Sequence, residues 1–536
     1  MRFNAAVPEP LPSPRKPAAL RLGWWLLGFL VLTVLGLWLA HERGKAQLEA
    51  YKRQLLAKGE RLTLAGHVPP PPLAASNGVT QYRKAVERLP SPDNSGENLH
   101  RPWPMVGIAP GRAMVSWKQP SLPRENDKRL VADLWPDFSA HLADNRERLS
   151  ELAATLDLPA FSFPFDAAKF LTGSETEWFM ATTKGQDWLV SATLHDLRFD
   201  AVDDAWRWWR AASRLALRSQ NPRAVIGLLI HNRLVSRSST MTWEALRFPG
   251  WSDAQLAEIQ QLWLEQDALQ AVLDGFSMER AYTIESMAMF RTNLPALWTS
   301  AQMQRGGMAA AIAGPPDVWT TALRDAPLDT LRDTLPLLPW PFWTSYSEER
   351  AALKLQTGMV NAWQTAKTVG SLQRGLAEAH TLTPLRPSKS FWQLFDDDAF
   401  EVWSTAKMVR NATIVVQARL TLTAIALHRH RLKHGGFPTE LSALVPTILP
   451  AVPRDFMDGQ PLRYRLEADG QFRLWSVGED FKDDGADATP VDPSKAGDSV
   501  NWLKGRDWVW PLPATEAEVA AYHAARAARR SPPPDP

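Results

Sequence analysis

The stretch LGWWLLGFLVLTVLGLWLA, residues 22–40, sets the architecture of this 536-residue chain, because it carries no charged side chain. A helix rises 1.5 Å per residue, so these nineteen residues reach roughly 28 Å, close to the thickness of about 30 Å of the hydrocarbon layer of a bilayer. Leu22 to Ala40 is therefore predicted to be a transmembrane helix, and residues 1–21 a cytoplasmic tail.

A cleaved signal peptide is the alternative for this stretch. Signal peptidase needs small residues at the last and third-last positions before its cut, whereas Ala40 follows Leu39 and Trp38. Basic residues flank the stretch on both sides, so their bias does not set the orientation. The short N-terminal tail and the long C-terminal body favour a tail inside the cell and a body outside the cytoplasm.

Composition limits the function classes. A chain of this length is expected to form two or three packed units. The 60 basic and 58 acidic side chains leave a net charge of +2 and no concentrated basic face, so nucleic acid is not an expected partner. The absence of cysteine excludes disulfides, thiolate catalysis and cysteine-ligated metals. The 25 tryptophans are expected to lie mainly in the core.

Residues 41–125 are interpreted as a juxtamembrane helix followed by a linker. Lys45 to Glu60 continues the anchor as a charged helix, and the prolines from Pro69 to Pro72 stop helix propagation. Between Pro90 and Pro123, proline, glycine and serine recur without a period, which predicts an irregular connection or a long surface loop.

Residues 126–399 show helical periodicity and are predicted to form a body of helical hairpins. Val202, Trp206 and Trp209 lie on one stripe at the spacing of a helix that buries one face. Ser252 and Gln255 form a capping box that starts another helix. No fixed repeat period emerges, so a solenoid is not predicted.

Residues 400–512 have a different character. A long helix from Glu401 to Lys433 ends at two glycines, Gly435 and Gly436. Strand-like runs follow at 462–466 and 471–477, joined by an Asp-Gly hairpin turn signal, and a third run lies at 507–510. The chain is therefore predicted to be mainly α with a C-terminal α+β module of a helix and a small antiparallel sheet. Residues 513–536 are interpreted as a C-terminal helix and a proline-rich tail.

The common catalytic motifs are absent from the sequence. It contains no phosphate-binding glycine loop, no Gly-x-Ser-x-Gly elbow and no His-Glu-x-x-His pair. His428, His430 and His434 form a histidine cluster, but the basic residues between them favour a helix end that complements the helix dipole over a metal site. No catalytic residue is predicted, and whether the chain is an enzyme stays open.

An acidic loop follows the second strand-like run. Its oxygen-bearing side chains are Ser476, Glu479, Asp480, Asp483, Asp484 and Asp487, with glycines at 478 and 485. Calcium takes six to eight oxygen ligands and tolerates irregular geometry, so such a loop suits it better than magnesium or zinc. The EF-hand template fails, because Lys482 and Val491 fill its third and twelfth places. A solvated acidic turn is the alternative.

Several short motifs recur in a fixed order towards the C-terminus. They comprise Gly436-Phe437-Pro438, Leu441, Leu444, Asp455, Asp458, Gly459, Pro461, Tyr464, Leu474, Trp475, Ser476, Gly478, Asp480 and Asp507-Trp508-Val509-Trp510. In this order the region resembles the C-terminal domain of the major pseudopilin of type II secretion systems. The resemblance implies a calcium loop that includes Leu474, Ser476 and Asp480. Together with the acidic side chains of the same loop, the candidate calcium ligands are Leu474, Ser476, Asp480, Asp483, Asp484 and Asp487.

The N-terminal half departs from that family. A pseudopilin carries glutamate at the fifth position after its processing glycine, whereas Gly23 is followed there by Gly28. Nor does a pseudopilin hold some three hundred helical residues between anchor and sheet. The whole chain resembles large membrane-anchored proteins of planctomycete and verrucomicrobial type, which places it in the bacterial inner (cytoplasmic) membrane with its large domain facing the periplasm.

The expected function is that of a membrane-anchored extracytoplasmic scaffold or interaction protein. Its C-terminal module is expected to be calcium-stabilised, and its partners to include components of a secretion or pilus-like assembly. Two alternatives stay open: an extracytoplasmic hydrolase with its site in the helical body, and a divergent pseudopilin.

Overall fold

A computed structural model of the chain describes residues 18–70, 72–73, 77–90, 102–120, 135–173, 177–219, 223–293, 295–297, 340–382, 403–492 and 502–528. Most of the predicted cytoplasmic tail and the end of the predicted proline-rich tail lie outside these ranges. The chain divides into two compact units. The first comprises residues 1–60, 287–352 and 387–396, and the second comprises residues 61–286, 353–386 and 397–536.

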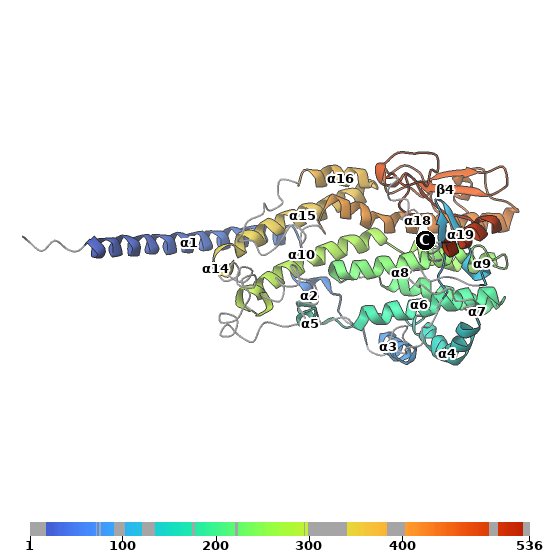
Figure 1. The fold of residues 1–536 in the computed structure, drawn as a ribbon, viewed down its shortest axis with the longest axis horizontal. Helices are drawn as coiled ribbons and strands as arrows, with labels where there is room; N and C mark the ends of the chain where they lie inside the picture. The colour runs from blue at the N-terminus through green and yellow to red at the C-terminus, as the bar shows by residue number, and fades with distance from the viewer. Residues whose placement is uncertain are drawn as a thin grey trace, which may run out of the picture. The chain divides into compact units, whose positions relative to one another are not determined.

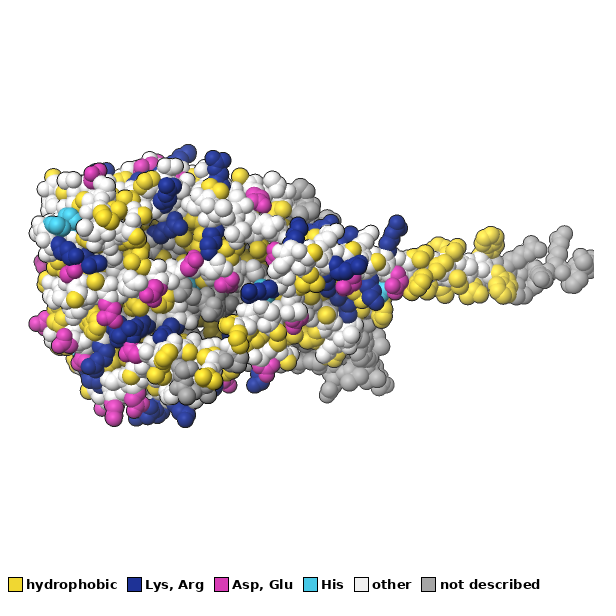
Figure 2. All heavy atoms as spheres, turned by 180° about the vertical axis from the view of Figure 1, so that it is seen from behind, with side chains coloured by type: hydrophobic (Ala, Val, Ile, Leu, Met, Phe, Trp, Pro, Cys, Tyr) yellow, Lys and Arg dark blue, Asp and Glu magenta, His cyan; other side chains and the backbone are white. Residues whose placement is uncertain are grey.

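The first unit is built on α1, Ala18–Ala57, one unbroken helix that contains both the predicted anchor and the predicted charged continuation (Figure 1). Among the described residues, α1 is the one helix long and apolar enough to cross a membrane. Its apolar half is exposed, with Trp25 at 79% and Phe29 at 72%. Figure 2 shows this half as a continuous yellow stretch with dark blue side chains where it ends.

The polar half of α1 packs within the same unit. Leu48 is buried, and Lys52 pairs with the fully buried Glu349 at 2.7 Å. Arg291 pairs with the same carboxylate at 2.5 Å. At the start of this half, His41 Nδ1 donates to the carbonyl oxygen of Phe342 in α14, Trp340–Trp343. These contacts hold the polar half of α1 to the rest of the first unit, while the apolar half of α1 extends beyond them.

The second unit is a set of packed helices, as predicted (Figure 1). Its helices are α2 Leu64–His67, α3 Val79–Arg88, α4 Trp135–Thr155, α5 Ala167–Leu171, α6 Glu177–Arg198, α7 Val202–Arg218, α8 Ala224–Ala245, α9 Asp253–Leu264, α16 Leu372–His380, α18 Thr405–His434 and α19 Glu516–Ala528, with most of α10 Ala268–Thr292 and α15 Ser345–Val369. Helix α6 packs against α7 and α8, and α18 packs against α8 and α9.

One continuous hydrophobic core runs through this unit. It includes side chains from the body, such as Trp188 of α6, and from the C-terminal region, such as Leu474. The long helix α18 therefore buries its apolar side chains against body helices as well as against the sheet. Among the residues that the structure describes, eight tryptophans are fully buried, seven of them in this core and Trp340 in a separate cluster of the first unit: Trp188, Trp208, Trp209, Trp243, Trp340, Trp363, Trp508 and Trp510. The expectation that tryptophans build the core is confirmed for these eight.

The predicted C-terminal sheet is present. Strands β3 Arg463–Leu466, β4 Phe472–Ser476 and β5 Trp508–Val509 pair antiparallel in the order β3-β4-β5. The end of α18 is as expected, because Gly435 caps it in the left-handed region with φ of 79°. The mainly α fold with a small C-terminal antiparallel sheet is therefore confirmed.

A second sheet was not predicted. Strands β1 Val106–Ala109 and β2 Arg112–Met114 form a hairpin inside the stretch interpreted as an irregular connection. The C-terminal strand β6, Leu512–Pro513, pairs in parallel with β2. These strands have only two to four residues, too few to show a period of two, and β6 lies 400 positions from β2.

Glu244 at the end of α8 joins these distant segments. Its side chain is fully buried, and Oε1 accepts hydrogen bonds from the backbone amides of Met105, at 2.6 Å, and Ser116, at 2.9 Å. The neighbouring Trp243 donates its indole N–H to the carbonyl of Pro511 at 2.7 Å. Burial raises the pKa of Glu244 to about 7, although the amides of Ser116 and Met105 favour the charged form.

Replacing Glu244 with glutamine removes this titration and keeps an oxygen that accepts both amide bonds. The folded pKa of about 7 exceeds the ordinary value of 4.5, so the folded chain holds the proton more tightly than the unfolded chain. The free energy of unfolding therefore falls as pH rises between these values, by up to about 1.4 kcal/mol per pH unit. We expect Glu244→Gln to remove this fall, as measured by denaturant unfolding of the full chain in detergent at about pH 5 and about pH 8.

The matched control is Glu265→Gln, because Glu265 is an exposed glutamate just beyond α9. This variant is expected to follow the wild-type pH profile. Superimposable profiles for wild type and Glu244→Gln would contradict a titrating buried carboxyl.

Candidate functional site

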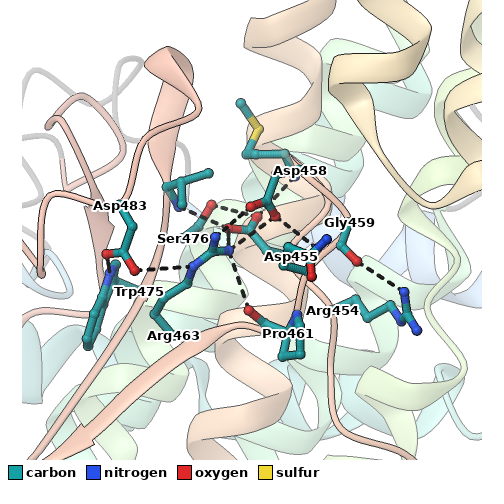
Figure 3. A network of polar contacts seen from close by, with 12 residues as sticks. Arg454, Asp455, Asp458, Gly459, Pro461, Arg463, Trp475, Ser476 and Asp483 are labelled. Atoms are coloured by element: carbon teal, nitrogen blue, oxygen red, sulfur yellow. Dashed lines mark hydrogen bonds and ion pairs between the residues drawn. The ribbon is translucent and has the colours of Figure 1, made fainter.

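The C-terminal sheet and the turn before it hold a network of charged side chains around one buried carboxylate (Figure 3). The turn is closed by hydrogen bonds from the amide of Asp455 to the carbonyl of Gln460, at 2.7 Å, and from the amide of Gly459 to the carbonyl of Asp455, at 2.8 Å. It leads into β3, which carries Arg463, and β3 is followed by β4, which ends at Ser476. The turn and the two strands thus bring Asp455, Arg463 and Ser476 together.

Asp455 is the buried acceptor of this network. Its side chain has no exposed surface and accepts from Ser476 Oγ at 2.8 Å, from the amide of Val477 at 2.9 Å and from the amide of Met457 at 3.0 Å. Burial raises the pKa of Asp455 above its ordinary value, against the effect of these hydrogen bonds. A carboxylate in this setting needs a nearby positive charge.

Arg463 supplies that charge. Its guanidinium pairs with Asp455 at 3.1 Å, with Asp458 at 2.5 Å and with Asp483 at 3.6 Å. Figure 3 shows the guanidinium pointing into the space between these acidic side chains. Burial would lower the pKa of Arg463, but the three carboxylates raise it above its ordinary value. Arg463 is therefore the cation at the centre of this cluster.

The predicted calcium ligands lie in the same region with other partners. The carbonyl of Leu474 accepts the amide of Trp510 within the sheet, and Ser476 Oγ donates to Asp455. Asp480 accepts the amide of Lys482, at 3.1 Å. Asp483 accepts the indole N–H of Trp475, at 2.9 Å.

The remaining two predicted ligands, Asp484 and Asp487, belong to a loop whose backbone amides surround the side chain of Asp507. Asp507, fully buried, accepts from the backbone amides of Asp484 at 3.3 Å, Ala486 at 2.8 Å and Asp487 at 3.1 Å. Burial raises the pKa of Asp507 to about 6, opposed by these three amides. The side chain of Asp487 turns to Thr489, whose amide and hydroxyl it accepts.

The predicted ligands described above make hydrogen bonds with separate partners. In the part of the chain that the structure describes, no three histidine, aspartate or glutamate side chains are grouped as a metal site. Two positions that organise the region, Arg463 and Asp507, were not among the predicted site residues. A single arginine between hydrophobic strand residues gives no sequence signal of its three partners. Asp507 was predicted only as the start of a strand-like run and as part of the family resemblance.

No family model, curated protein or solved structure matches this chain. The resemblance to the pseudopilin C-terminal domain therefore stays a prediction.

Replacing Arg463 with glutamine leaves the buried Asp455 without its cation. Breaking a buried pair by removing one partner costs about 3 kcal/mol or more, so we expect a loss of this size in the free energy of unfolding at neutral pH. The loss is expected to shrink at about pH 4, because protonation of the carboxyls removes the unpaired charge. Denaturant unfolding at both pH values measures it.

Arg465→Gln is the matched control on the same strand. Arg465 is half exposed and pairs with Glu467 at 3.0 Å, so its loss is expected to change stability by less than about 1 kcal/mol. Equal effects of the two substitutions would show that Arg463 does not neutralise the cluster.

Calcium is expected to leave the wild-type chain unchanged. Since Arg463 already neutralises the cluster and amides surround Asp507, thermal unfolding curves in calcium and in chelator should coincide. A ligand that binds only the folded state raises the melting temperature. A higher melting temperature in calcium, abolished by Asp480→Asn, would restore the predicted calcium site.

Proposed function

We propose that this protein is a single-pass membrane-anchored scaffold that holds its helical body at a lipid surface. The observation that carries the proposal is the exposure of the apolar half of α1. Trp24, Phe29 and Leu32 are each exposed by more than two thirds, and the surrounding positions from 24 to 39 are almost all exposed as well. A soluble protein buries such a stripe against its own core.

Aromatic residues support a span across the bilayer. Trp24 and Trp25 lie near one end of the apolar run and Trp38 lies near the other, roughly 20 Å apart at 1.5 Å per residue. Tryptophan is enriched at both membrane interfaces. In α14, Phe342 is 71% exposed and Trp343 is 39% exposed, and the carbonyl of Phe342 is bonded to His41 directly after the run. These aromatics support an interface at the level of His41.

The packing of the polar half of α1 favours an anchor that is kept. Lys52 and Arg291 both pair with the buried Glu349, so α1 contributes to the fold of the first unit. A signal peptide cleaved near Ala40 would function only in export. It would not need to continue, as α1 does, into a helical segment that packs in the folded unit. We propose the bacterial inner membrane as the location, with the body in the periplasm.

The partner surface belongs to the body in this proposal. The resemblance of the C-terminal region to pseudopilins is the reason to look for components of a secretion or pilus-like assembly among the partners. Cross-linking in intact membranes, followed by purification in detergent, would identify them.

A charge in the middle of the apolar run tests the anchor. Arginine at the centre of a spanning helix costs about 2.5–3.5 kcal/mol of insertion free energy. We expect Val31→Arg to raise the fraction of protein released from membranes by alkaline carbonate. Leu56→Arg is the matched control, since Leu56 is exposed on the polar half of the same helix and its replacement should leave the protein in the membrane.

The orientation can be read in the same preparation. The chain has no cysteine, so Ala451→Cys introduces a single exposed thiol in the body. A membrane-impermeant maleimide applied to cells with a permeabilised outer membrane should label it. Labelling only after lysis would place the body in the cytoplasm. In the carbonate experiment, equal release of Val31→Arg and Leu56→Arg would contradict the anchor.

A further inference from the structure

Three polar side chains of the second unit form a hydrogen-bonded chain between α4 and α6. Ser139 Oγ lies 2.8 Å from His195 Nε2. On the other side of the imidazole, Nδ1 lies 2.7 Å from Asp196 Oδ1. Serine, histidine and aspartate thus follow one another in the order, and at the distances, that activate a serine hydroxyl for nucleophilic attack.

The aspartate is held in place as a charged orienting group. Asp196 is 1% exposed, and it accepts from Arg146 Nη2 at 2.9 Å and from the indole N–H of Trp208 at 2.9 Å. Burial opposes its ionisation, but the hydrogen bonds from His195, Arg146 and Trp208 outweigh this and lower the pKa of Asp196. With Asp196 charged, Nδ1 of His195 carries the hydrogen, and Nε2 is left to accept the hydroxyl hydrogen of Ser139.

Ser139 is only partly buried in its helix, and Ala140 beside it is exposed. Phe199, 54% exposed, places its ring 4.6 Å from the imidazole of His195. Phe138 packs on the imidazole from a second direction, at 5.9 Å between ring centroids. Of these two rings only Phe199 is exposed, and an exposed aromatic ring beside the imidazole favours an apolar or aromatic acyl group.

The position of Ser139 also favours a developing negative charge. It lies one turn into α4, and helix side chains point back towards the N-terminus of their helix. The first-turn amides of a helix lack partners within the helix and carry its positive dipole end.

We propose that Ser139, His195 and Asp196 form an acyl-transfer site that hydrolyses carboxylic esters with apolar or aromatic acyl groups. Ser139 Oγ forms a bond to the carbonyl carbon while its proton passes to His195 Nε2. The bond from that carbon to the alcohol oxygen breaks, and the alcohol leaves with the Nε2 proton. Water then gives a proton to Nε2 and its oxygen to the acyl carbon, which releases the acid and returns the proton to Ser139.

A fluorophosphonate probe tests the site, because it phosphonylates serine hydroxyls that a histidine activates. The full chain in detergent is treated with the probe and analysed by intact mass and peptide mapping. We expect one adduct on Ser139, none in Ser139→Ala, and hydrolysis of p-nitrophenyl butyrate by wild type at least about 100-fold faster than by Ser139→Ala. Asp196→Asn should slow both reactions by a similar factor, because it no longer fixes the tautomer of His195.

Ser150→Ala is the matched control, since Ser150 is a half-buried serine of α4 whose hydroxyl donates to the carbonyl of Arg146. It should label and hydrolyse as wild type does. The proposal is overturned if folded wild-type protein takes up no probe at Ser139 and hydrolyses the ester no faster than Ser139→Ala. Circular dichroism of both variants separates a lost reaction from a lost fold.

Discussion

The structure depends most on one constraint, which is that the apolar half of α1 must be covered by something other than water. Twelve large apolar side chains between Trp24 and Leu39 are exposed. At about 2 kcal/mol for each such side chain removed from water, their burial is worth on the order of 20 kcal/mol. The whole free energy of unfolding of a domain is about 5–15 kcal/mol. Surface charge interactions do not contribute a free energy of this size. The burial of these side chains in the proposed lipid surface is therefore the largest contribution to where this protein resides.

Within the second unit, buried polar groups specify which segments pair with one another, which the hydrophobic core alone does not. The core joins body and sheet, but apolar contacts accept many relative positions of two segments. Glu244 accepts hydrogen bonds from two amides more than a hundred positions away, and Arg463 requires Asp455 and Asp458 to lie beside β3. A wrong pairing would leave a buried charge without its partner, at a cost of several kcal/mol. These charges therefore specify which strand and which turn meet.

The predictable parts of the fold are those with local chemical signals. The capping box of Ser252 and Gln255 and the left-handed Gly435 were read correctly because cap chemistry lies within a few residues. The sheet of β1, β2 and β6 was not predicted, because β1 and β2 have only four and three residues and β6 begins at residue 512. Composition predicted the acidic loop, but it does not show that the loop amides converge on Asp507 or that Arg463 pairs with Asp455. His195 and Asp196 are adjacent in sequence, but Ser139 is 56 positions away on another helix, so only the packing of α4 on α6 reveals the chain of three.

Fold stability alone does not explain why Ser139, His195 and Asp196 are hydrogen-bonded one after another. Arg146 and Trp208 already satisfy Asp196, so the fold does not need the imidazole to neutralise a buried carboxylate. A single neutral hydrogen bond such as that between Ser139 and His195 contributes only about 1 kcal/mol to stability, and an apolar pair of the same shape would pack there at little loss. What such a replacement would abolish is the directed path for a proton from a half-buried hydroxyl to a fixed imidazole. The two proposals made above combine functions that the sequence suggested as alternatives, a scaffold at a membrane and a hydrolase.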